Sequence, residues 1–485
     1  MGSLKKGILV SYFSVFITII SGILITPLIV STLGANEYGV YIYLSASFGL
    51  CSVFNLCVNQ TFTRFIVNNT DEKLYIKVLT NLLTIVLLIV LFIIIFVILL
   101  FYNFKKQQTL VVTELNLSYY CLFLSIIVVL RLLNECFLGI YIAFKEYVYP
   151  QAIRILFAVL RIVLIFVLLP NFSNLFFIFS LDLFVSLMSS IFLILPLIKK
   201  NRLVFDSSCI KIKELKIILY FMLGILAISL VNFLRWKFGE LLLGFHGLYA
   251  DVTVFSLSVM LGSYIGAFTS SFSNLLLPNI NEIYINSGLK GVESEVIRVS
   301  RYVAFIVTLI LTSFILIGQV FVEIWLKGEY PMVWNFSLFI MASLGVLLIQ
   351  SSFNTYLQII NEHGKRSVLF LIPTLLTMIL GILLVKSGGI KLMVSMACTS
   401  ILIGVILSNI YYSRLGFNML HYYKKVLFIP TVYTIIVLTI KLVFDDISNV
   451  TSFVLVFINT ILVYRFVISN TERKFLKSLL SQNKI

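Results

Sequence analysis

The sequence predicts an all-α integral membrane protein with about 14 transmembrane helices and with both termini in the cytoplasm. Three observations lead to this fold class. The 485-residue chain is 60% apolar and only 12% charged, whereas about a quarter of the residues of a soluble protein are charged. Long apolar runs recur along the whole chain, and Lys and Arg gather in every second connection between them.

The apolar runs set the number of helices. A transmembrane helix needs about 20 mainly apolar residues, and fourteen runs meet this requirement. They are 7–33, 38–67, 78–102, 117–143, 148–170, 172–198, 217–243, 248–278, 299–323, 333–360, 367–386, 390–413, 424–443 and 450–468. The first run is too long for the apolar part of a cleaved signal peptide and lacks a small-residue cleavage site, so we expect it to be the first membrane helix.

The distribution of basic residues sets the topology. If the N-terminus is inside and the spans alternate, the inside segments hold 26 of the 36 Lys and Arg, and the outside segments hold six. Cytoplasmic loops of membrane proteins are enriched in Lys and Arg, so this bias predicts cytoplasmic termini and an even number of spans. It also explains the net charge of +16, so no nucleic-acid partner is predicted.

The most basic inside connection, KKNRLVFDSSCIKIKELK, separates the sixth span from the seventh. We therefore predict two six-helix halves followed by an addition. The parts are an N-terminal lobe (1–198), a basic cytoplasmic linker (199–216), a C-terminal lobe (217–415), and two extra helices with a basic tail (416–485). A weak repeat supports the division, since Gly34–Tyr41 and Gly247–Phe255 each place a Gly and an acid before a span. Six spans return the chain to its starting side, so such a repeat is parallel.

Motifs for enzymatic chemistry are missing from the sequence. It contains no Walker loop, no nucleophile elbow and no HExxH, and its six cysteines form no CxxC. The three histidines lie far apart, so no metal site is predicted. The acidic pair Asp445-Asp446 falls in a short outside loop, where we expect it to be solvated. These observations predict that the protein is not an enzyme.

Ionisable residues interrupt the apolar runs of spans 4 to 6. Arg131 and Glu135 lie four residues apart, so they share a helix face and can pair. Arg154 and Arg161 share a face of span 5, and Asp182 lies in the middle of span 6. Charge within hydrocarbon is costly and usually functional. The five residues carry one net positive charge, and they indicate either a polar cavity lining or structural ion pairs.

Spans 2 and 7 are polar as well. Asn55 and Asn59 recur every four residues in span 2, as in a helix that lines a cavity. Arg235, Lys237 and Glu240 crowd the outer part of span 7. For Lys237, snorkelling to the membrane interface is an equally good interpretation.

Spans 1, 2 and 7 carry a resemblance to a known family. The stretch Pro27-Leu-Ile-Val-Ser-Thr-Leu-Gly-Ala-Asn-Glu-Tyr-Gly-Val-Tyr41 resembles the "P…LG…YG.Y" pattern of bacterial polysaccharide repeat-unit flippases for O-antigen or capsule. Asn55-Leu-Cys-Val-Asn-Gln-Thr-Phe-Thr-Arg64 resembles their "DLG……TR" segment, with Asn55 at the Asp position and Cys57 at the Gly position. Leu241–Gly247 resembles their "ILG.FLG" pattern, which usually follows an Asp; here Glu240 or Gly239 stands nearby. The family belongs to the multidrug/oligosaccharidyl-lipid/polysaccharide exporter superfamily.

The resemblance implies two six-helix lobes in a V and alternating access that moves a polyprenyl-diphosphate-linked oligosaccharide across the membrane. We expect arginines to bind the diphosphate, because a guanidinium offers bidentate contacts, and asparagines to bind the glycan. The expected lining residues are Arg64, Arg131, Arg154, Arg161, Arg235, Asn55 and Asn59. Three acids can bind a coupling H⁺ or Na⁺ or play a structural role: Glu135, Asp182 and Glu240. No cofactor is expected beyond such an ion.

The expected location is the bacterial cytoplasmic (inner) membrane. Expected partners are the lipid-linked oligosaccharide, membrane lipids, and the polysaccharide polymerase and chain-length machinery. Two alternatives within the superfamily are a drug exporter and a flippase for the peptidoglycan precursor. A drug exporter favours acidic cavity residues for cationic substrates, whereas these spans are rich in Arg. An integral-membrane glycan polymerase or transferase is an alternative of another class, but it needs a sizeable outside loop, and the sequence has none.

Overall fold

The chain folds into helices throughout the part that the structure describes. A computed structural model describes residues 2–67, 72–106, 114–172, 174–360, 362–443 and 449–466. These residues form fourteen α-helices, joined by short 3-10, π-helical and loop segments. Three predicted features lie outside the described residues, namely residues 107–113 of the outside connection 103–116, the acidic pair Asp445-Asp446 and the basic tail from 467 onwards.

The helices divide into two compact units. The first unit comprises residues 1–253 with 385–389, and the second comprises 254–384 with 390–485. The first unit contains α1 (Gly2–Gly49), α2 (Val53–Val67), α3 (Glu72–Lys106), α4 (Glu114–Ala143), α5 (Val148–Leu168), α6 (Leu175–Lys199) and α7 (Ile212–Phe245). The other helices are α8 (Tyr249–Trp325), α9 (Met332–Ile349), α10 (Ser351–Ile359), α11 (His363–Arg414), α12 (Met419–Tyr422), α13 (Phe428–Val443) and α14 (Asn449–Phe466). The division into transport lobes around 199–216 stays a prediction.

Helix lengths confirm the predicted fold class. Ten helices of the described chain are long and apolar enough to cross a membrane. Two of them, Phe16–Val67 and Gly364–Arg414, each cover two predicted spans. The helical geometry is interrupted inside them at Gly34 (φ 77°) and Gly389 (φ 48°), close to the predicted span boundaries. A positive φ is costly for residues with a side chain, which explains why glycine stands at these two points.

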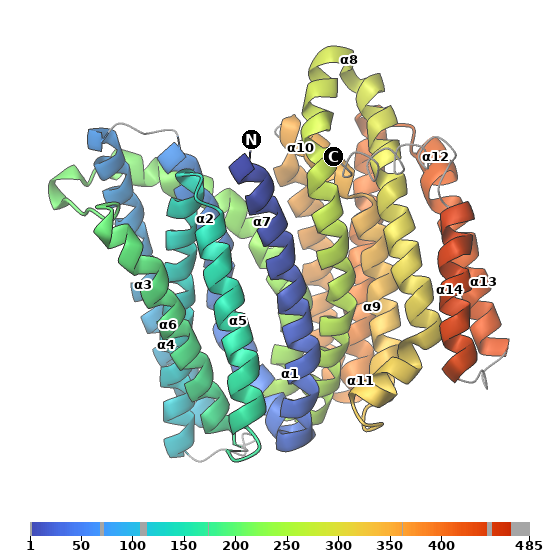
Figure 1. The fold of residues 1–485 in the computed structure, drawn as a ribbon, viewed down its shortest axis with the longest axis horizontal. Coiled ribbons are helices and arrows are strands. Elements are labelled where there is room, and N and C mark those ends of the chain that lie inside the picture. Colours follow the sequence, from blue (N-terminus) through green and yellow to red (C-terminus); the bar gives the residue numbers. More distant parts are fainter. Residues whose placement is uncertain are drawn as a thin grey trace. The chain divides into compact units, whose positions relative to one another are not determined.

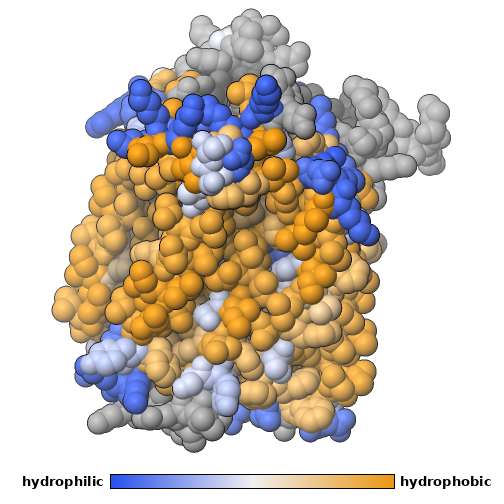
Figure 2. All heavy atoms as spheres, turned by 90° about the vertical axis from the view of Figure 1, so that its left-hand side faces the viewer, coloured by the Kyte–Doolittle hydropathy of each residue, from blue (hydrophilic) through white to orange (hydrophobic). Residues whose placement is uncertain are grey.

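The outer surface of the first unit is suited to lipid. Along α3, the side chains of Leu87, Leu91, Ile95 and Ile98 are exposed. Figure 2 shows one face of the molecule, where a broad apolar band separates two hydrophilic rims. Such a large apolar surface is unfavourable in water. With the ten candidate spans, it identifies the chain as a multi-pass integral membrane protein.

Close packing of α2 on α4 positions the polar residues of the first unit. A side chain at Gly139 of α4 would lie 2.6 Å from Cβ of Phe62 and 2.9 Å from the backbone oxygen of Asn59, both on α2. Only a glycine leaves room for this approach, because small residues let membrane helices come together. α4 also packs against α6, while α5 packs against α1 and α6. Figure 1 shows these long helices running roughly side by side.

The basic connection between α6 and α7 is docked onto the first unit. The buried side chain of Asn81 on α3 accepts a hydrogen bond from the backbone N–H of Lys211 at 3.1 Å. Glu146, in the α4–α5 turn, pairs with Lys200 at 2.9 Å and with Arg202 at 3.0 Å. The predicted linker is therefore held in place by specific contacts at both of its ends.

The second unit has an aromatic core, and polar contacts attach its last helices. The rings of Phe353 and Tyr412 stack at 4.3 Å between centroids. Asn459 of α14 donates a hydrogen bond to Thr312 of α8 at 3.0 Å and accepts one from Tyr433 of α13 at 2.7 Å. Because Asn459 is buried, these bonds fix α13 and α14 to α8.

Candidate polar site within the membrane helices

One group of ionisable residues joins α2, α4 and α5. Oε1 of Glu135 on α4 pairs with Nη2 of Arg154 on α5 at 2.8 Å. Its other oxygen, Oε2, accepts a hydrogen bond from Nδ2 of Asn59 on α2 at 2.6 Å. α2 and α4 approach closely at Gly139, which lies one helical turn after Glu135 on α4. This approach brings the Asn59 amide within hydrogen-bonding distance of Glu135. We call Asn59, Glu135 and Arg154 the inner tier, because they lie nearer the predicted cytoplasmic ends of their helices.

A second group joins α1, α5 and α6. Arg161 of α5 donates two hydrogen bonds to Asp182 of α6, from Nε to Oδ1 at 2.7 Å and from Nη2 to Oδ2 at 3.2 Å. The hydroxyl of Tyr41 on α1 donates a third to Oδ2 at 3.0 Å. Asp182 is buried, and Arg161 is partly exposed. We call Tyr41, Arg161 and Asp182 the outer tier; it lies about 10 Å from the inner tier along α5, since Arg154 and Arg161 are two helical turns apart.

Arg131 differs from the other arginines of spans 4 to 6. The i,i+4 spacing suggested that it can pair with Glu135, but the structure shows a different partner for that carboxylate. Glu135 is turned toward α2 and α5, where Arg154 and Asn59 use both of its oxygens. The side chain of Arg131 is exposed, and no described carboxylate lies within 4.0 Å of it. Arg131 lies within electrostatic range of the Tyr41 hydroxyl, next to the outer tier.

The two tiers and Arg131 therefore form a polar site with one net positive charge. The site holds three arginines and two carboxylates, and each carboxylate is paired with one arginine, Arg154 or Arg161. A buried charge is tolerated when it is paired and hydrogen-bonded. The arrangement satisfies both carboxylates and leaves the Arg131 guanidinium open to an anion. A guanidinium binds phosphate oxygens in a bidentate way.

The predicted residues of span 7 form their own contacts on α7. Lys237 pairs with Glu240 at 2.8 Å, and the carboxylate of Glu240 is almost completely buried. The Lys237 side chain is about two-fifths exposed, so its position agrees with a snorkelling lysine that also neutralises a buried acid. Arg235, one turn before Glu240 on the same helix, is buried.

The remaining predicted residues lie on α2. Arg64 is exposed, and its guanidinium carbon lies 4.3 Å from the ring centroid of Phe221 on α7, a cation–π contact. Asn55 has a buried amide oxygen for which the described residues offer no hydrogen-bond donor. The structure thus joins Asn59 to the charged tiers, whereas Arg64 stacks against α7.

Tyr41 is the residue of the outer tier that sequence reasoning missed. It is the last residue of the Pro27–Tyr41 stretch, and the resemblance of this stretch to a family motif implies no role for the tyrosine. The motif itself, and a position in span 2 about four helical turns before Asn55, were the available signals. Nothing in the sequence shows that its hydroxyl meets Asp182, 141 residues further along the chain.

Comparison with solved structures identifies the fold. The lipid II flippase MurJ in an inward closed conformation superposes with a TM-score of 0.70 and 16% identity, over 96% of this chain and 99% of that one. An inward-facing multidrug resistance MATE family transporter of the MOP superfamily gives a TM-score of 0.57 and 16% identity, over 84% and 94%. A mutant of the Vibrio cholerae MATE transporter VcmN gives 0.58 and 14% identity, over 86% and 98%.

No protein-family model matches the sequence, and no curated protein matches it either. The chain has the fold of MurJ and the MATE transporters, which are transport proteins and not enzymes. At these identities the likeness shows the fold alone.

Proposed function

We propose that this protein is a flippase that moves polyprenyl-diphosphate-linked oligosaccharide repeat units across the bacterial cytoplasmic membrane by alternating access. Its products would supply the assembly of O-antigen, capsule or another surface polysaccharide. The proposal combines the polar site with the fold of MurJ, which is named as a lipid II flippase.

The observation that carries the proposal is the open guanidinium of Arg131 between two neutralised tiers. A carboxylate partner would make the site neutral and purely structural, but both acids are engaged by other arginines. An anionic group can therefore bind Arg131 without displacing a described carboxylate. A diphosphate matches the site because it is anionic and presents several oxygens to planar guanidinium donors.

The tiers give the diphosphate a route along the helices. Arg154, Arg131 and Arg161 follow one another from the predicted cytoplasmic half toward the outer half of α4 and α5. In the proposed cycle the diphosphate competes with Glu135 for Arg154 and with Asp182 for Arg161 as access alternates. Protonation of either acid by a coupling H⁺, or its binding to Na⁺, would release its arginine to the substrate.

The flippase for the peptidoglycan precursor is the second candidate. It is favoured by the near-complete coverage of both chains in the MurJ superposition. A drug exporter is less well supported, because the net positive charge of the site disfavours a cationic drug, and the MATE transporters superpose over a smaller part of this chain.

The proposal can be tested with variants that remove charges from the polar site but leave the protein folded. In reconstituted vesicles, the Arg131→Met variant should lose translocation of a polyprenyl-diphosphate oligosaccharide, while the matched surface variant Lys73→Met should retain it. A double variant, Arg161→Met with Asp182→Leu, removes both charges of the outer tier, a change that often leaves stability intact. We expect it to keep its unfolding temperature and to lose translocation.

Unchanged translocation by both the Arg131→Met variant and the double variant would overturn the proposal. Parallel assays with lipid II and with a cationic dye distinguish the candidates. Transport of lipid II in preference to other lipid-linked glycans would assign the second candidate. Transport of the dye alone would point to a drug exporter.

A further inference from the structure

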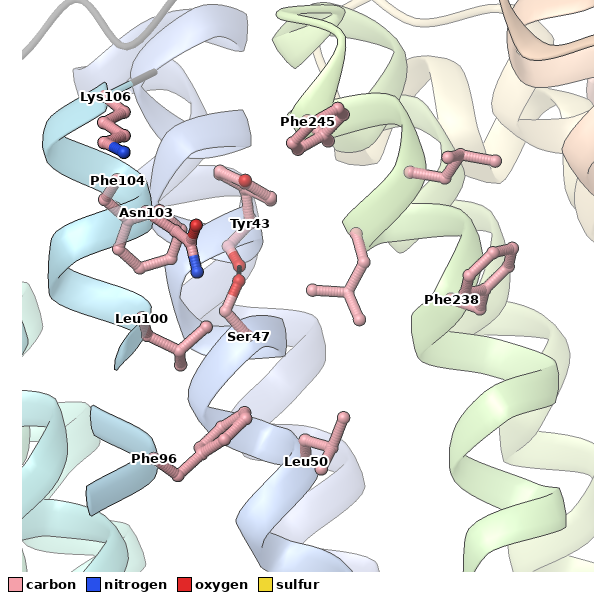
Figure 3. A pocket seen from close by; sticks show the side chains of 12 residues that line it. Tyr43, Ser47, Leu50, Phe96, Leu100, Asn103, Phe104, Lys106, Phe238 and Phe245 are labelled. Atoms are coloured by element: carbon pink, nitrogen blue, oxygen red, sulfur yellow. Dashed lines mark hydrogen bonds between the residues drawn. The ribbon is translucent and has the colours of Figure 1, made fainter. Parts of the chain in front are cut away.

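The first unit contains a cavity that the proposed function does not use. It lies between α7 on one side and α1 and α3 on the other, as Figure 3 shows. Its volume of about 630 Å³ is within the range of pockets that hold small molecules, roughly 300–1,000 Å³. Most of its lining is apolar, and it includes the aromatic side chains Phe96, Phe104, Phe238 and Phe245.

The one charged side chain among the lining residues, Lys106, lies at one end of the cavity. Lys106, the last residue of α3, has an exposed side chain that lines the cavity. In Figure 3, Lys106 and Phe245 lie at the same end as the C-terminal turns of α3 and α7, while Phe96 lies deeper. By the predicted topology this is the outer side of the membrane. The cavity thus has a cationic mouth at an interface and an aromatic interior at membrane depth.

The cavity is separate from the polar site. Tyr41 and Tyr43 are two residues apart on α1, so their side chains point to nearly opposite faces of the helix. Tyr41 binds Asp182 of the outer tier, whereas Tyr43 lines the cavity. The cavity and the outer tier therefore lie on different faces of α1.

A glycine contact keeps the outer end of α7 against α1. A Cβ atom at Gly244 would overlap the ring of Tyr43, so the two helices can approach here only because residue 244 has no side chain. Below this contact the cavity separates Ser47 of α1 and Leu50 of the 3-10 turn Leu50–Ser52 from Phe238 of α7.

We propose that this cavity binds an anionic glycerophospholipid from the outer leaflet. One acyl chain occupies the aromatic interior, and the phosphate contacts Lys106. Charge complementarity at the mouth and an apolar interior at membrane depth are the two features that select this ligand. A basic residue at a membrane surface attracts anionic lipids in preference to zwitterionic ones.

Photocrosslinking of the full-length protein tests this site directly. The protein is placed in phosphatidylcholine nanodiscs that contain a phosphatidylglycerol with a diazirine on one acyl chain. We expect crosslinks to peptides from 96–106 and 238–245. Replacing Lys106 by Gln should lower the crosslink yield about fivefold, as expected for one basic residue at a surface, while the matched variant Lys105→Gln should keep the wild-type yield.

Two substitutions should fill the cavity, Leu241→Trp on the α7 wall and Leu100→Trp on the α3 wall. If one of these variants fails to fold, the other still tests the site. Loss of the crosslinks in a folded filled variant supports the site, and wild-type yield in both overturns it. Equal labelling by a diazirine phosphatidylcholine would overturn the anionic preference. Displacement of the label by polyprenyl phosphate, but not by unlabelled phosphatidylglycerol, would overturn the choice of a glycerophospholipid.

Discussion

Asp182 illustrates how the buried charges are accommodated at the scale of single residues. Its two oxygens accept three hydrogen bonds, two from one guanidinium and one from a phenol. A carboxylate without such partners would be very costly at this depth. Tyr41 therefore contributes to stability as well as to the orientation of the acid.

Replacing Tyr41 by Phe should lower stability by about 1 kcal/mol, the usual net contribution of a hydrogen bond, with somewhat more because the acceptor is charged. The ion pair with Arg161 remains, so the variant should still fold. Thermal unfolding in detergent measures the change. The exposed Tyr119 provides the control, since Tyr119→Phe should leave the unfolding temperature unchanged, and a Tyr41→Phe variant as stable as this control would contradict the role of the hydroxyl.

The pairing of residues across helices was the part of the site that the sequence did not predict. Spacing along one helix identifies neighbours on that helix, which is why Arg131 and Glu135 were a plausible pair. The actual partner of Glu135 depends on how closely α2, α4 and α5 pack. The close packing of α2 on α4 depends on Gly139, which no spacing rule singles out.

At the scale of elements, the contact between α2 and α4 is the most sensitive to change. In a Gly139→Ala variant the added Cβ would meet Phe62 and the backbone of Asn59, so one helix has to shift. Overpacking of this kind costs about 1–3 kcal/mol. We expect a lower unfolding temperature and impaired translocation, because the shift moves Asn59 away from Glu135.

Gly364 provides the matched control for this substitution. It lies in the first turn of α11 with nothing within 4 Å of an added Cβ. Gly364→Ala should be neutral or slightly stabilising, since alanine is the better helix former. If Gly139→Ala behaved like Gly364→Ala, the packing account of the inner tier would be wrong.

The docked linker between α6 and α7 depends on Glu146. Partial burial alone raises the pKa of this carboxyl, but hydrogen bonds and charges from Lys200 and Arg202 outweigh it and hold the pKa below its ordinary value. The stabilisation by a group with a depressed pKa is present above its unfolded-state pKa and is lost as the pH falls through the folded-state pKa. The linker should therefore stay docked at neutral pH. It should be released in acid, once the pH falls below the ordinary glutamate pKa and Glu146 becomes protonated.

The Glu146→Gln variant should release one end of the linker at pH 7. We expect faster cleavage near Arg202 and Lys211 in limited proteolysis with trypsin, while the membrane helices stay protected. The exposed acid Glu37 on α1 offers a control, because Glu37→Gln should leave the cleavage rate unchanged. Cleavage of Glu146→Gln at the wild-type rate would show that the ion pairs do not hold the linker.

At the scale of the whole molecule, the number and position of the helices were predictable because bilayer thickness fixes the length of a span. The described parts of all fourteen apolar runs fall on helices, and three helices, interrupted at Gly34, Gly288 and Gly389, each extend over parts of two runs. The division of the helices into compact units was not predictable in the same way. Hydropathy shows where a helix is but not which neighbours it packs against, and α7 packs on α1 and α2.

The predicted topology can be tested on the unmodified chain. Five of the six cysteines are buried, and Cys209, in the linker, is partly exposed. A membrane-impermeant maleimide should therefore label the protein in inverted membrane vesicles and leave it unlabelled in intact cells. A Cys209→Ser variant should remove the label, and labelling of Cys209 from outside the cell would reverse the topology.

The pairing of charges between consecutive helices also bears on how the protein enters the membrane. Glu135 and Arg154 belong to α4 and α5, and Arg161 and Asp182 belong to α5 and α6, so each charge meets its partner when the next helix is synthesised. A charged helix inserts poorly alone, at a cost of about 2.5–3.5 kcal/mol per central charge. The three helices should therefore leave the translocon as one group, with Arg131 as the charge that stays uncompensated during biogenesis.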